Sequence, residues 1–324
     1  VNQSYWMLVD GTQGDTVLGK YWDGRLFGLH GPIAFDTIFN HIISFGSYIG
    51  QQADSLRFFR ATTLDMSTIV WETYYTPDFF NTPNRFTRMM PAIDGGYIDC
   101  RERSVQGSIS QSRVAKFDGT GNLLWQQQYG PAGHRCFTSW IDVTHDSCYI
   151  ISGIQRPLWV GSTDSTWCFL QKIDRNGVPV WRKTFVIDPS LPIKDAFTAR
   201  FDGRETPDGG YLFVGSFATS QAGYSLNAKF DSTLTLAGRK WYMPRDSAVA
   251  YGEGYADGTC MLAGAQPNLQ IPFSIRRTGP NGETIWKKTL TNPCRGANAV
   301  IFIGDSTAIL AGSRSPSCYI FFSD

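Results

Sequence analysis

The sequence predicts an all-β fold, a β-propeller, and three observations lead to that prediction. The first is composition, because aromatic residues make up 14% of the 324 residues and there are 33 glycines. This mixture suits short strands joined by tight turns. The second is a hairpin that recurs along the chain with a tryptophan on its second strand. The third is another hairpin that recurs between the copies of the first. Together they predict four strands in each repeat, as in a propeller blade.

The tryptophan hairpin supplies the last two strands of a repeat, and each of its five copies reads as strand, polar turn and strand. One copy is KFDGTGNLLWQQQYG, residues 116–130, and its turn contains the Asp and Gly that tight hairpins tolerate. The five tryptophans follow one another at 54, 56, 60 and 45 residues. We expect them at one position in each blade, packed between blades rather than docking a cofactor. They are Trp71, Trp125, Trp181, Trp241 and Trp286.

The second hairpin supplies the first two strands of a repeat. Its turn and apolar strand read AIDGGYIDC at residues 92–100 and PDGGYLFVGS at residues 207–216, and three more copies follow the same plan. A strand candidate precedes each turn, and residues 35–47 look like a degenerate copy. Four such strands place both hairpin turns at one end of the blade and the longer connections at the other. We call these the turn end and the loop end.

The number of blades depends on both ends of the sequence. The last repeat supplies three strands, and residues 14–22 match the missing fourth strand, with Trp22 near the tryptophan position. We therefore predict one domain over residues 1–324, with six four-stranded blades and the N-terminal strand completing the last blade. Seven blades is the alternative, because residues 5–9 also resemble a third strand.

The repeat pattern, with DGGY in one hairpin and KFDGTGNLLW in the next, resembles a known group of propeller repeats. These repeats belong to secreted and surface proteins common in Bacteroidetes-type bacteria, which often carry a sorting domain for type IX secretion. The resemblance covers nearly the whole chain at the level of the repeat. It implies a propeller fold, a secreted or cell-surface location, and a role in adhesion, binding or scaffolding.

Charge and motifs argue against several classes of function. The net charge of +1 offers no field for nucleic acid, and no apolar run reaches the roughly 20 residues that span a bilayer. There is no P-loop, dinucleotide fingerprint, GxSxG elbow or acidic calcium loop. The four histidines lack metal-ligand spacing, and His145 falls in a hairpin turn where we expect it to be solvated. We therefore expect no cofactor, no metal and no enzymatic activity.

Seven cysteines are present, and none forms a CxxC pattern. Cys136 and Cys168 lie at the loop end of the third repeat, and Cys294 and Cys318 occupy nearly the same positions in the last repeat. This predicts the disulfides Cys136–Cys168 and Cys294–Cys318, and with them an oxidising compartment. The alternative is that the cysteines are buried thiols that pack as small hydrophobic residues.

Candidate binding residues gather at the predicted loop end. Arginines stand where first strands begin, so that they would form a ring around the mouth of a central channel, and two more lie further along such strands, where they could line the channel itself. Guanidinium groups hold carboxylate, phosphate or sugar hydroxyls. Aromatic residues in the connections between second and third strands suit contact with carbohydrate or protein. The residues are Arg85, Arg135, Arg245 and Arg295, then Arg88 and Arg200, and the aromatics Trp159 and Trp167.

These residues also have structural explanations. Each arginine could bond neighbouring backbone or an Asp such as Asp195 or Asp246, and the aromatics could anchor their loops. Our leading hypothesis is a non-enzymatic, extracytoplasmic propeller that binds a protein or glycan partner at the cell surface through its loop end. A structural subunit of a surface assembly or filament is the alternative, and an enzyme is the third.

Overall fold

A computed structural model confirms the all-β prediction. Among the residues that it describes, the chain forms 25 strands, and no helix is long and apolar enough to cross a bilayer. The structure describes residues 4–9, 16–22, 33–36, 40–48, 56–63, 67–75, 88–105, 109–157, 166–186, 198–218, 223–242, 251–254, 259–266, 271–279, 283–289, 297–303, 307–314 and 317–323.

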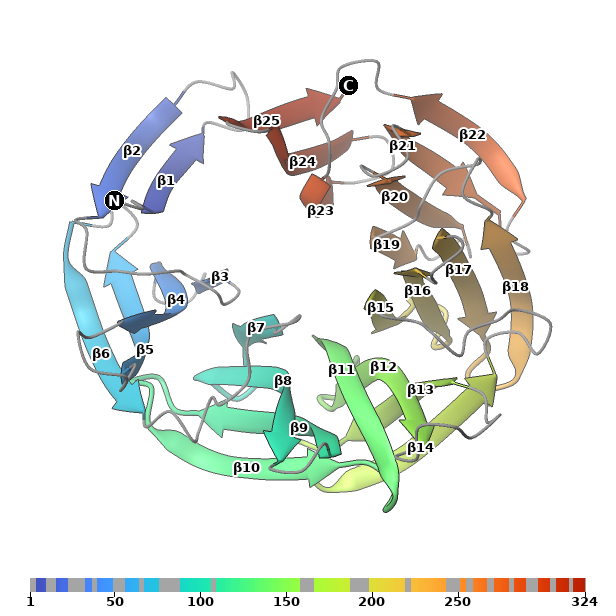
Figure 1. The fold of residues 1–324 in the computed structure, drawn as a ribbon, viewed down its shortest axis with the longest axis horizontal. Helices are drawn as coiled ribbons and strands as arrows, with labels where there is room; N and C mark the ends of the chain where they lie inside the picture. Colours follow the sequence, from blue (N-terminus) through green and yellow to red (C-terminus); the bar gives the residue numbers. More distant parts are fainter. Residues whose placement is uncertain are drawn as a thin grey trace. The chain divides into compact units, whose positions relative to one another are not determined.

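Five sheets contain four consecutive strands each, and the paired strands are antiparallel where the register is described (Figure 1). Their strands are β3 (Ile33–Asp36), β4 (His41–Tyr48), β5 (Leu56–Thr63) and β6 (Ile69–Tyr75); β7 (Arg88–Pro91), β8 (Tyr97–Val105), β9 (Ile109–Phe117) and β10 (Leu123–Tyr129); β11 (His134–Val143), β12 (Tyr149–Pro157), β13 (Trp167–Ile173) and β14 (Pro179–Val186); β15 (Thr198–Glu205), β16 (Tyr211–Ala218), β17 (Gly223–Phe230) and β18 (Leu236–Tyr242); β19 (Tyr251–Gly254), β20 (Cys260–Gln266), β21 (Ile271–Thr278) and β22 (Thr284–Thr289).

Two smaller sheets hold the remaining strands. β23 (Ala297–Ile303), β24 (Thr307–Arg314) and β25 (Ser317–Ser323) form a three-stranded sheet. β1 (Ser4–Val9) and β2 (Thr16–Trp22) pair with each other as a two-stranded sheet. The predicted repeat of four strands is thus confirmed. The pairing of β2 with β25, and with it the six-bladed closure, stays a prediction.

The chain divides into two compact units, and the division passes through the β11–β14 sheet. One unit is Val1–Ile141 with Ile173–Pro179, and the other is Asp142–Lys172 with Val180–Asp324. Within the first unit, β7 contacts β3. Within the second, β15 lies against β12, β19 against β15 and β16, and β23 against β19 and β20. The first strand of each of these sheets thus contacts the sheet before it. The prediction of a single domain over residues 1–324 stays a prediction.

Gly203 shows how closely neighbouring sheets approach. A Cβ atom on this residue of β15 would lie 2.5 Å from Leu170 Cδ2 and 2.6 Å from Ser152 Cβ. The Ser152 hydroxyl donates a buried hydrogen bond of 2.9 Å to the carbonyl of Phe201 on the same strand. The backbone of β15 therefore rests directly on the preceding sheet, and only glycine fits at this position.

The fourth strand of one sheet docks on the tryptophan hairpin of the next. Gly121 has a φ of +85°, and a Cβ atom there would lie 2.5 Å from Cζ3 of Trp71 on β6. Tyr75, four residues after Trp71, donates a hydrogen bond to the carbonyl of Gly121. The indole ring thus covers a glycine that no larger residue could replace. The predicted packing role of Trp71 is confirmed.

The same contact recurs one sheet later. A Cβ atom on Gly177, with φ +84°, would lie 2.9 Å from Trp125 Cζ3. The hydroxyl of Tyr129 donates a hydrogen bond of 2.6 Å to the carbonyl of Gly177. Burial, and after it the Asp174 carboxylate, raises the pKa of Tyr129, so this hydroxyl keeps the proton that it donates.

The contact between β14 and the turn that joins β17 to β18 departs from this pattern at two positions. Leu234 stands where Gly121 and Gly177 stand in their turns, and it also adopts a positive φ of 64°. Phe185 stands four residues after Trp181, where β6 and β10 carry a tyrosine, and its ring packs 4.9 Å from Phe213 and from Phe230. The hydroxyl and the glycine that it would bond are thus both lost, and aromatic packing replaces them.

The prediction that all five tryptophans share one position is wrong for Trp241. Trp71, Trp125 and Trp286 pair with Ala61, Lys116 and Arg277 on their third strands. On β18 the equivalent place, opposite Lys229, belongs to Gly238, and Trp241 pairs with Leu226 three residues further along. This shift adds three residues to the spacing of 60 before Trp241 and removes three from the spacing of 45 after it.

Candidate functional site

The acidic turns of the tryptophan hairpins are structural. Oδ1 of Asp118 accepts hydrogen bonds from the backbone N–H groups of Thr120 at 2.8 Å and Asn122 at 2.9 Å. Asp174 and Asp231 accept the same pair of bonds in their turns. Burial raises the pKa of Asp118, but the hydrogen bonds from Asn122 and Thr120 lower it more, so the net shift is downward. These carboxylates hold the backbone of the turn.

A second acidic residue stands in the turn of the first hairpin, where it pairs with a lysine of the third strand. Lys172 Nζ lies 2.7 Å from Asp146 Oδ2, and Lys229 Nζ lies 2.8 Å from Asp208 Oδ1. Lys116 pairs with Asp94 in the same way. The lysine side chains are at most 10% exposed, so each buried ammonium needs this partner. The DGG turns and the KFD or KID segments recur in the sequence because they meet in the fold.

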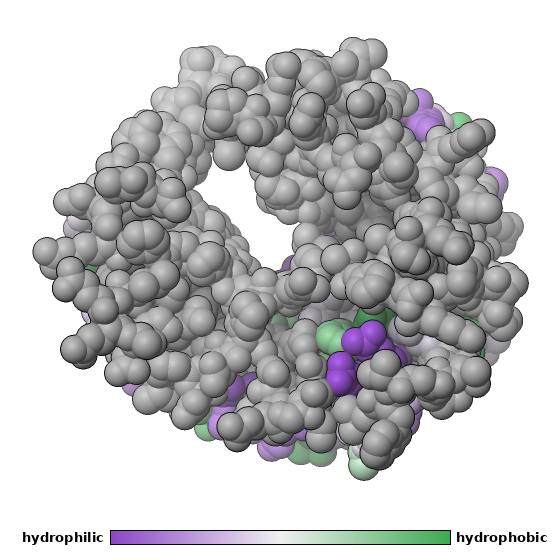
Figure 2. All heavy atoms as spheres, viewed as in Figure 1, coloured by the Kyte–Doolittle hydropathy of each residue, from purple (hydrophilic) through white to green (hydrophobic). Residues whose placement is uncertain are grey.

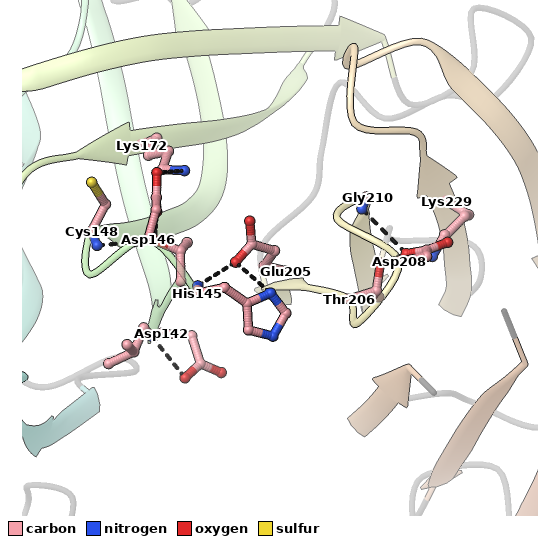
Figure 3. Close-up of polar contacts among 12 residues, drawn as sticks. Asp142, His145, Asp146, Cys148, Lys172, Glu205, Thr206, Asp208, Gly210 and Lys229 are labelled. Atoms are coloured by element: carbon pink, nitrogen blue, oxygen red, sulfur yellow. Dashed lines mark hydrogen bonds and ion pairs between the residues drawn. The ribbon is translucent and has the colours of Figure 1, made fainter. Parts of the chain in front are cut away.

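The candidate site joins two neighbouring sheets at the turn end of the second unit (Figure 3). Glu205, the last residue of β15, reaches the turn between β11 and β12. Its Oε2 accepts a hydrogen bond of 2.5 Å from the backbone N–H of His145 and lies 3.2 Å from His145 Nδ1. The Glu205 side chain is 10% exposed and the His145 side chain is 66% exposed.

This geometry orients the imidazole. Because Nδ1 faces the carboxylate, Nε2 is turned away from Glu205, as Figure 3 shows. A carboxylate that fixes one ring nitrogen leaves the other ready to exchange a proton or to accept a hydrogen bond from a ligand. The prediction that His145 is exposed is confirmed, but its partner Glu205 was missed. The two residues are 60 positions apart, and no local pattern connects them.

Charged groups of both signs surround this pair. Asp146 is held by Lys172, and Arg204 Nε lies 3.4 Å from Asp142 Oδ2. Burial lowers the pKa of Lys172, but the hydrogen bond to Asp146 and the charges of Asp146 and Glu205 raise it more. The Asp146–Lys172 pair therefore lies within the β11–β14 sheet, and the Arg204–Asp142 pair joins it to the β15–β18 sheet. The exposed His145 ring is the part of the cluster open to a ligand.

The described residues contain no group of three or more His, Cys, Asp or Glu side chains arranged to hold a metal ion. Within the cluster of Figure 3, the carboxylates accept hydrogen bonds from N–H or O–H groups, or lie beside cationic nitrogens. The cluster is thus a set of ion pairs and hydrogen bonds, some within one sheet and some, such as those of Glu205 and Arg204, between the two.

Two of the predicted arginines are described with their side chains. The guanidinium carbon of Arg88 lies 3.3 Å from the centre of the Trp140 ring, so this cation stacks on an aromatic residue of the next first strand. Arg135, at the loop end of β11, has a buried Nε without a hydrogen-bond partner among the described residues. Arg88 thus has a structural contact, whereas Arg135 has an unsatisfied donor. A ligand role for either stays a prediction.

The other predicted binding residues are described only in part. Trp167 begins β13 and is half-buried. Arg200 lies on β15, but its side chain is outside the described residues, as are Arg85, Arg245, Arg295 and Trp159 altogether. The predicted ring of arginines therefore stays a prediction.

The predicted Cys136–Cys168 disulfide does not form in this structure. Both residues are fully buried thiols, and none of the described cysteines is in a disulfide. Cys136 Sγ is directed at the backbone of Gly130, where a Cβ atom would lie 2.6 Å from it. Burial raises the pKa of Cys168 well above its usual range. Cys136 and Cys168 are therefore core residues, as the alternative predicted. Cys294 and the side chain of Cys318 lie outside the described residues.

Two solved structures resemble this chain over most of its length. One is the β-propeller domain of the Trilobed protease from Pyrococcus furiosus, with 9% identity and a TM-score of 0.51, covering 91% of this chain and 82% of that one. The other is the subtype N10 neuraminidase-like protein of A/little yellow-shouldered bat/Guatemala, with 8% identity and a TM-score of 0.51, covering 92% and 94%. The fold is that of a β-propeller.

The likeness is one of fold alone, because the identities are so low. No protein-family model matches the sequence, and no curated protein matches it either. Enzymes occur among the similar solved structures, such as an endo-arabinase from Bacteroides thetaiotaomicron with 11% identity and a TM-score of 0.44, covering 84% of this chain and 99% of that one. An identity of this size says nothing about a shared activity.

Proposed function

We propose that this chain is a non-enzymatic, extracytoplasmic propeller that binds a protein or glycan partner through its loop end. The observation that carries the proposal is Arg135, whose Nε is buried without a hydrogen-bond partner among the described residues. A buried donor without an acceptor costs about 1–3 kcal/mol. A carboxylate or hydroxyl oxygen of a partner would recover this free energy, and the planar guanidinium suits such acceptors.

The contacts at the turn end also favour the loop end as the place where a partner binds. Its lysines pair with Asp residues of their own sheets, and Glu205 holds His145. These contacts serve the fold, which favours the loop end as the binding end. The secreted, cell-surface location follows from the resemblance of the repeats. An assembly subunit remains the alternative, and the observation in favour of an enzyme is the oriented imidazole of His145.

The test compares Arg135→Ala with Arg175→Ala in a glycan array and a pull-down from the cell surface of the source organism. Arg175 is an exposed arginine in the turn between β13 and β14, so its removal changes net charge equally at the turn end. We expect Arg135→Ala to lose a partner that wild type and Arg175→Ala retain. Equal retention by both variants would contradict the site, and the absence of any partner for wild type would contradict the binding function.

We propose further that the propeller has six blades, with β2 as the outer strand of the β23–β25 sheet. The support is the sequence of β2, which ends in Lys-Tyr-Trp and so carries an aromatic residue near the tryptophan position of the repeat, and the three-stranded state of the β23–β25 sheet. Cysteine pairs placed between β2 and β25 test this closure. Disulfides at alternate positions within one chain are expected, and their complete absence at every position would favour seven blades.

A further inference from the structure

Tyr74 on β6 is an aromatic ring that faces solvent although its hydroxyl is held in place. The residue is 52% exposed. Its hydroxyl donates a hydrogen bond to Oε1 of Glu72, and Oε2 of Glu72 accepts hydrogen bonds from the guanidinium of Arg60. The Arg60 side chain is only 3% exposed and that of Glu72 is 14% exposed. A buried cation therefore fixes a carboxylate, which in turn fixes the exposed ring.

The face of β6 that carries Tyr74 is opposite to the one that makes the docking contact with Gly121. Alternate residues of a strand point to opposite faces. Trp71 and Tyr75 contact Gly121, so that face lies on the next sheet. Val70, Glu72 and Tyr74 share the opposite face, where Val70 is 44% exposed. This face combines an aromatic ring, an aliphatic side chain and a carboxylate.

The sister strands show that Tyr74 departs from the repeat. At the same register position, three residues after the docking tryptophan, the fourth strands of other sheets carry Gln128, Thr184 and Thr289. On β10 the described outer side chains are mixed, and green and purple patches alternate along the lower margin of Figure 2, where Figure 1 draws this strand. The repeat itself therefore does not require an aromatic residue at this position.

One other strand places an aromatic residue at this position. Trp241 pairs with Leu226, three residues before Lys229, just as Tyr74 pairs with Phe58, three residues before Ala61. The tryptophan of β18 has therefore moved from the docking position to the position of Tyr74. Two of the five fourth strands share this feature, one in each unit.

We propose that Tyr74 and Glu72 form a carbohydrate-binding platform on the outer strand β6, with Trp241 at the matching position of β18. A sugar ring stacks its C–H face on an exposed Tyr or Trp, and its hydroxyls bond adjacent carboxylate or phenol oxygens. The fixed ring loses little conformational entropy on binding. The ligand class is a neutral oligosaccharide, and this site is independent of the loop end and of Arg135.

The experiment titrates the full chain with hexasaccharides of neutral hexoses and of N-acetylhexosamines, followed by calorimetry and by NMR of the aromatic side chains. The variants are Tyr74→Ala, Trp241→Ala and Tyr74→Phe, and the matched control is Gln128→Ala, at the same register on β10. We expect Tyr74→Ala to weaken binding roughly two- to tenfold. Gln128→Ala should bind as wild type, and Tyr74→Phe should lie between because it keeps the ring but loses the bond to Glu72.

The proposal is overturned if no oligosaccharide binds, or if Tyr74→Ala binds as tightly as Gln128→Ala. Thermal unfolding of each variant shows whether it folds, and the exposure of Tyr74 makes a folded alanine variant the expected result. Retained oligosaccharide binding in Arg135→Ala separates this platform from the loop end. Loss of binding in Arg135→Ala alone would assign the oligosaccharide to the loop end and overturn the platform.

Discussion

Replacing Gly121 by alanine tests the docking contact that joins two neighbouring sheets. Gly121 has a φ of +85°, and its added Cβ atom would meet Trp71 Cζ3 at 2.5 Å, Trp71 Cη2 at 3.0 Å and Phe59 Cδ1 at 3.1 Å. A left-handed backbone costs a residue with a side chain about 1–2 kcal/mol. Overpacking a well-filled contact costs about 1–3 kcal/mol more. We expect Gly121→Ala to lower the free energy of unfolding by about 2–5 kcal/mol.

Two other glycines separate the two contributions. Gly95 has a φ of +89° but nothing within 4 Å of its Cβ position, so Gly95→Ala measures the backbone cost alone. Gly119 has nothing within 4 Å of its Cβ position and lies in the same turn as Gly121, so Gly119→Ala should change stability by less than about 0.5 kcal/mol. Urea unfolding at pH 7 measures the free energy of unfolding of all three variants, and the comparison requires that its dependence on urea concentration has the same slope in each.

The double variant Trp71→Ala with Gly121→Ala completes the test. Removing the indole removes the clash, so the two losses should not add, and the coupling should be about 1–3 kcal/mol. The reasoning is refuted if Gly121→Ala loses no more stability than Gly95→Ala. Strict additivity of the two single variants would refute it as well.

Three further predictions concern hydrogen bonds, acid stability and thiols. Tyr129→Phe should cost about 1 kcal/mol in urea unfolding, because the buried bond to the Gly177 carbonyl is lost, and no loss would contradict that bond. Burial raises the pKa of Asp208, but the bonds from Lys229, Thr206 and Gly210 lower it more, to about 2. A depressed pKa contributes stability above the unfolded value near 3.9 that is lost as pH falls towards 2, so Asp208→Asn should show a flatter loss in pH-dependent melts between about pH 4 and pH 2. Cys168 should resist alkylation in the native chain and react without reductant once the chain is unfolded, as peptide mass mapping would show; a disulfide-linked peptide would contradict the structure.

The repeat made most of the fold predictable. Turn residues, apolar alternation and the recurrence of Trp71, Trp125 and Trp286 are local patterns, and each predicts a strand or a hairpin without reference to the rest of the chain. The position of Trp241 was predicted wrongly because the tryptophan of β18 stands three residues further along the strand, and an alignment by residue type does not reveal strand register. The cysteine pairing failed for a similar reason. Matching positions in two repeats placed Cys136 and Cys168 near one end of a sheet, but the direction of each side chain decides whether sulfurs meet.

The candidate site was less accessible from the sequence. Arg88 and Arg135 looked alike there, and only coordinates distinguish a guanidinium stacked on Trp140 from one with an unsatisfied Nε. The Tyr74–Glu72 pair lies within one strand, but its anchor, Arg60, comes from the strand before it. The alternation of residues along β6 predicts that Val70, Glu72 and Tyr74 share one face. It does not predict that Val70 and Tyr74 on this face are exposed.

The sequence by itself determined that the chain is built from repeated four-stranded sheets, because hairpin turns and strand alternation are encoded by neighbouring residues. It also determined which residues recur, among them the Asp of the acidic turns and a Lys on three of the third strands. The tertiary structure alone decided what these residues do. It showed Lys172 meeting Asp146, Trp71 covering Gly121, and Glu205 holding His145. The contacts of Tyr75 with Gly121 and of Glu205 with His145 join residues 46 and 60 positions apart, and such pairings are set by packing rather than by local pattern.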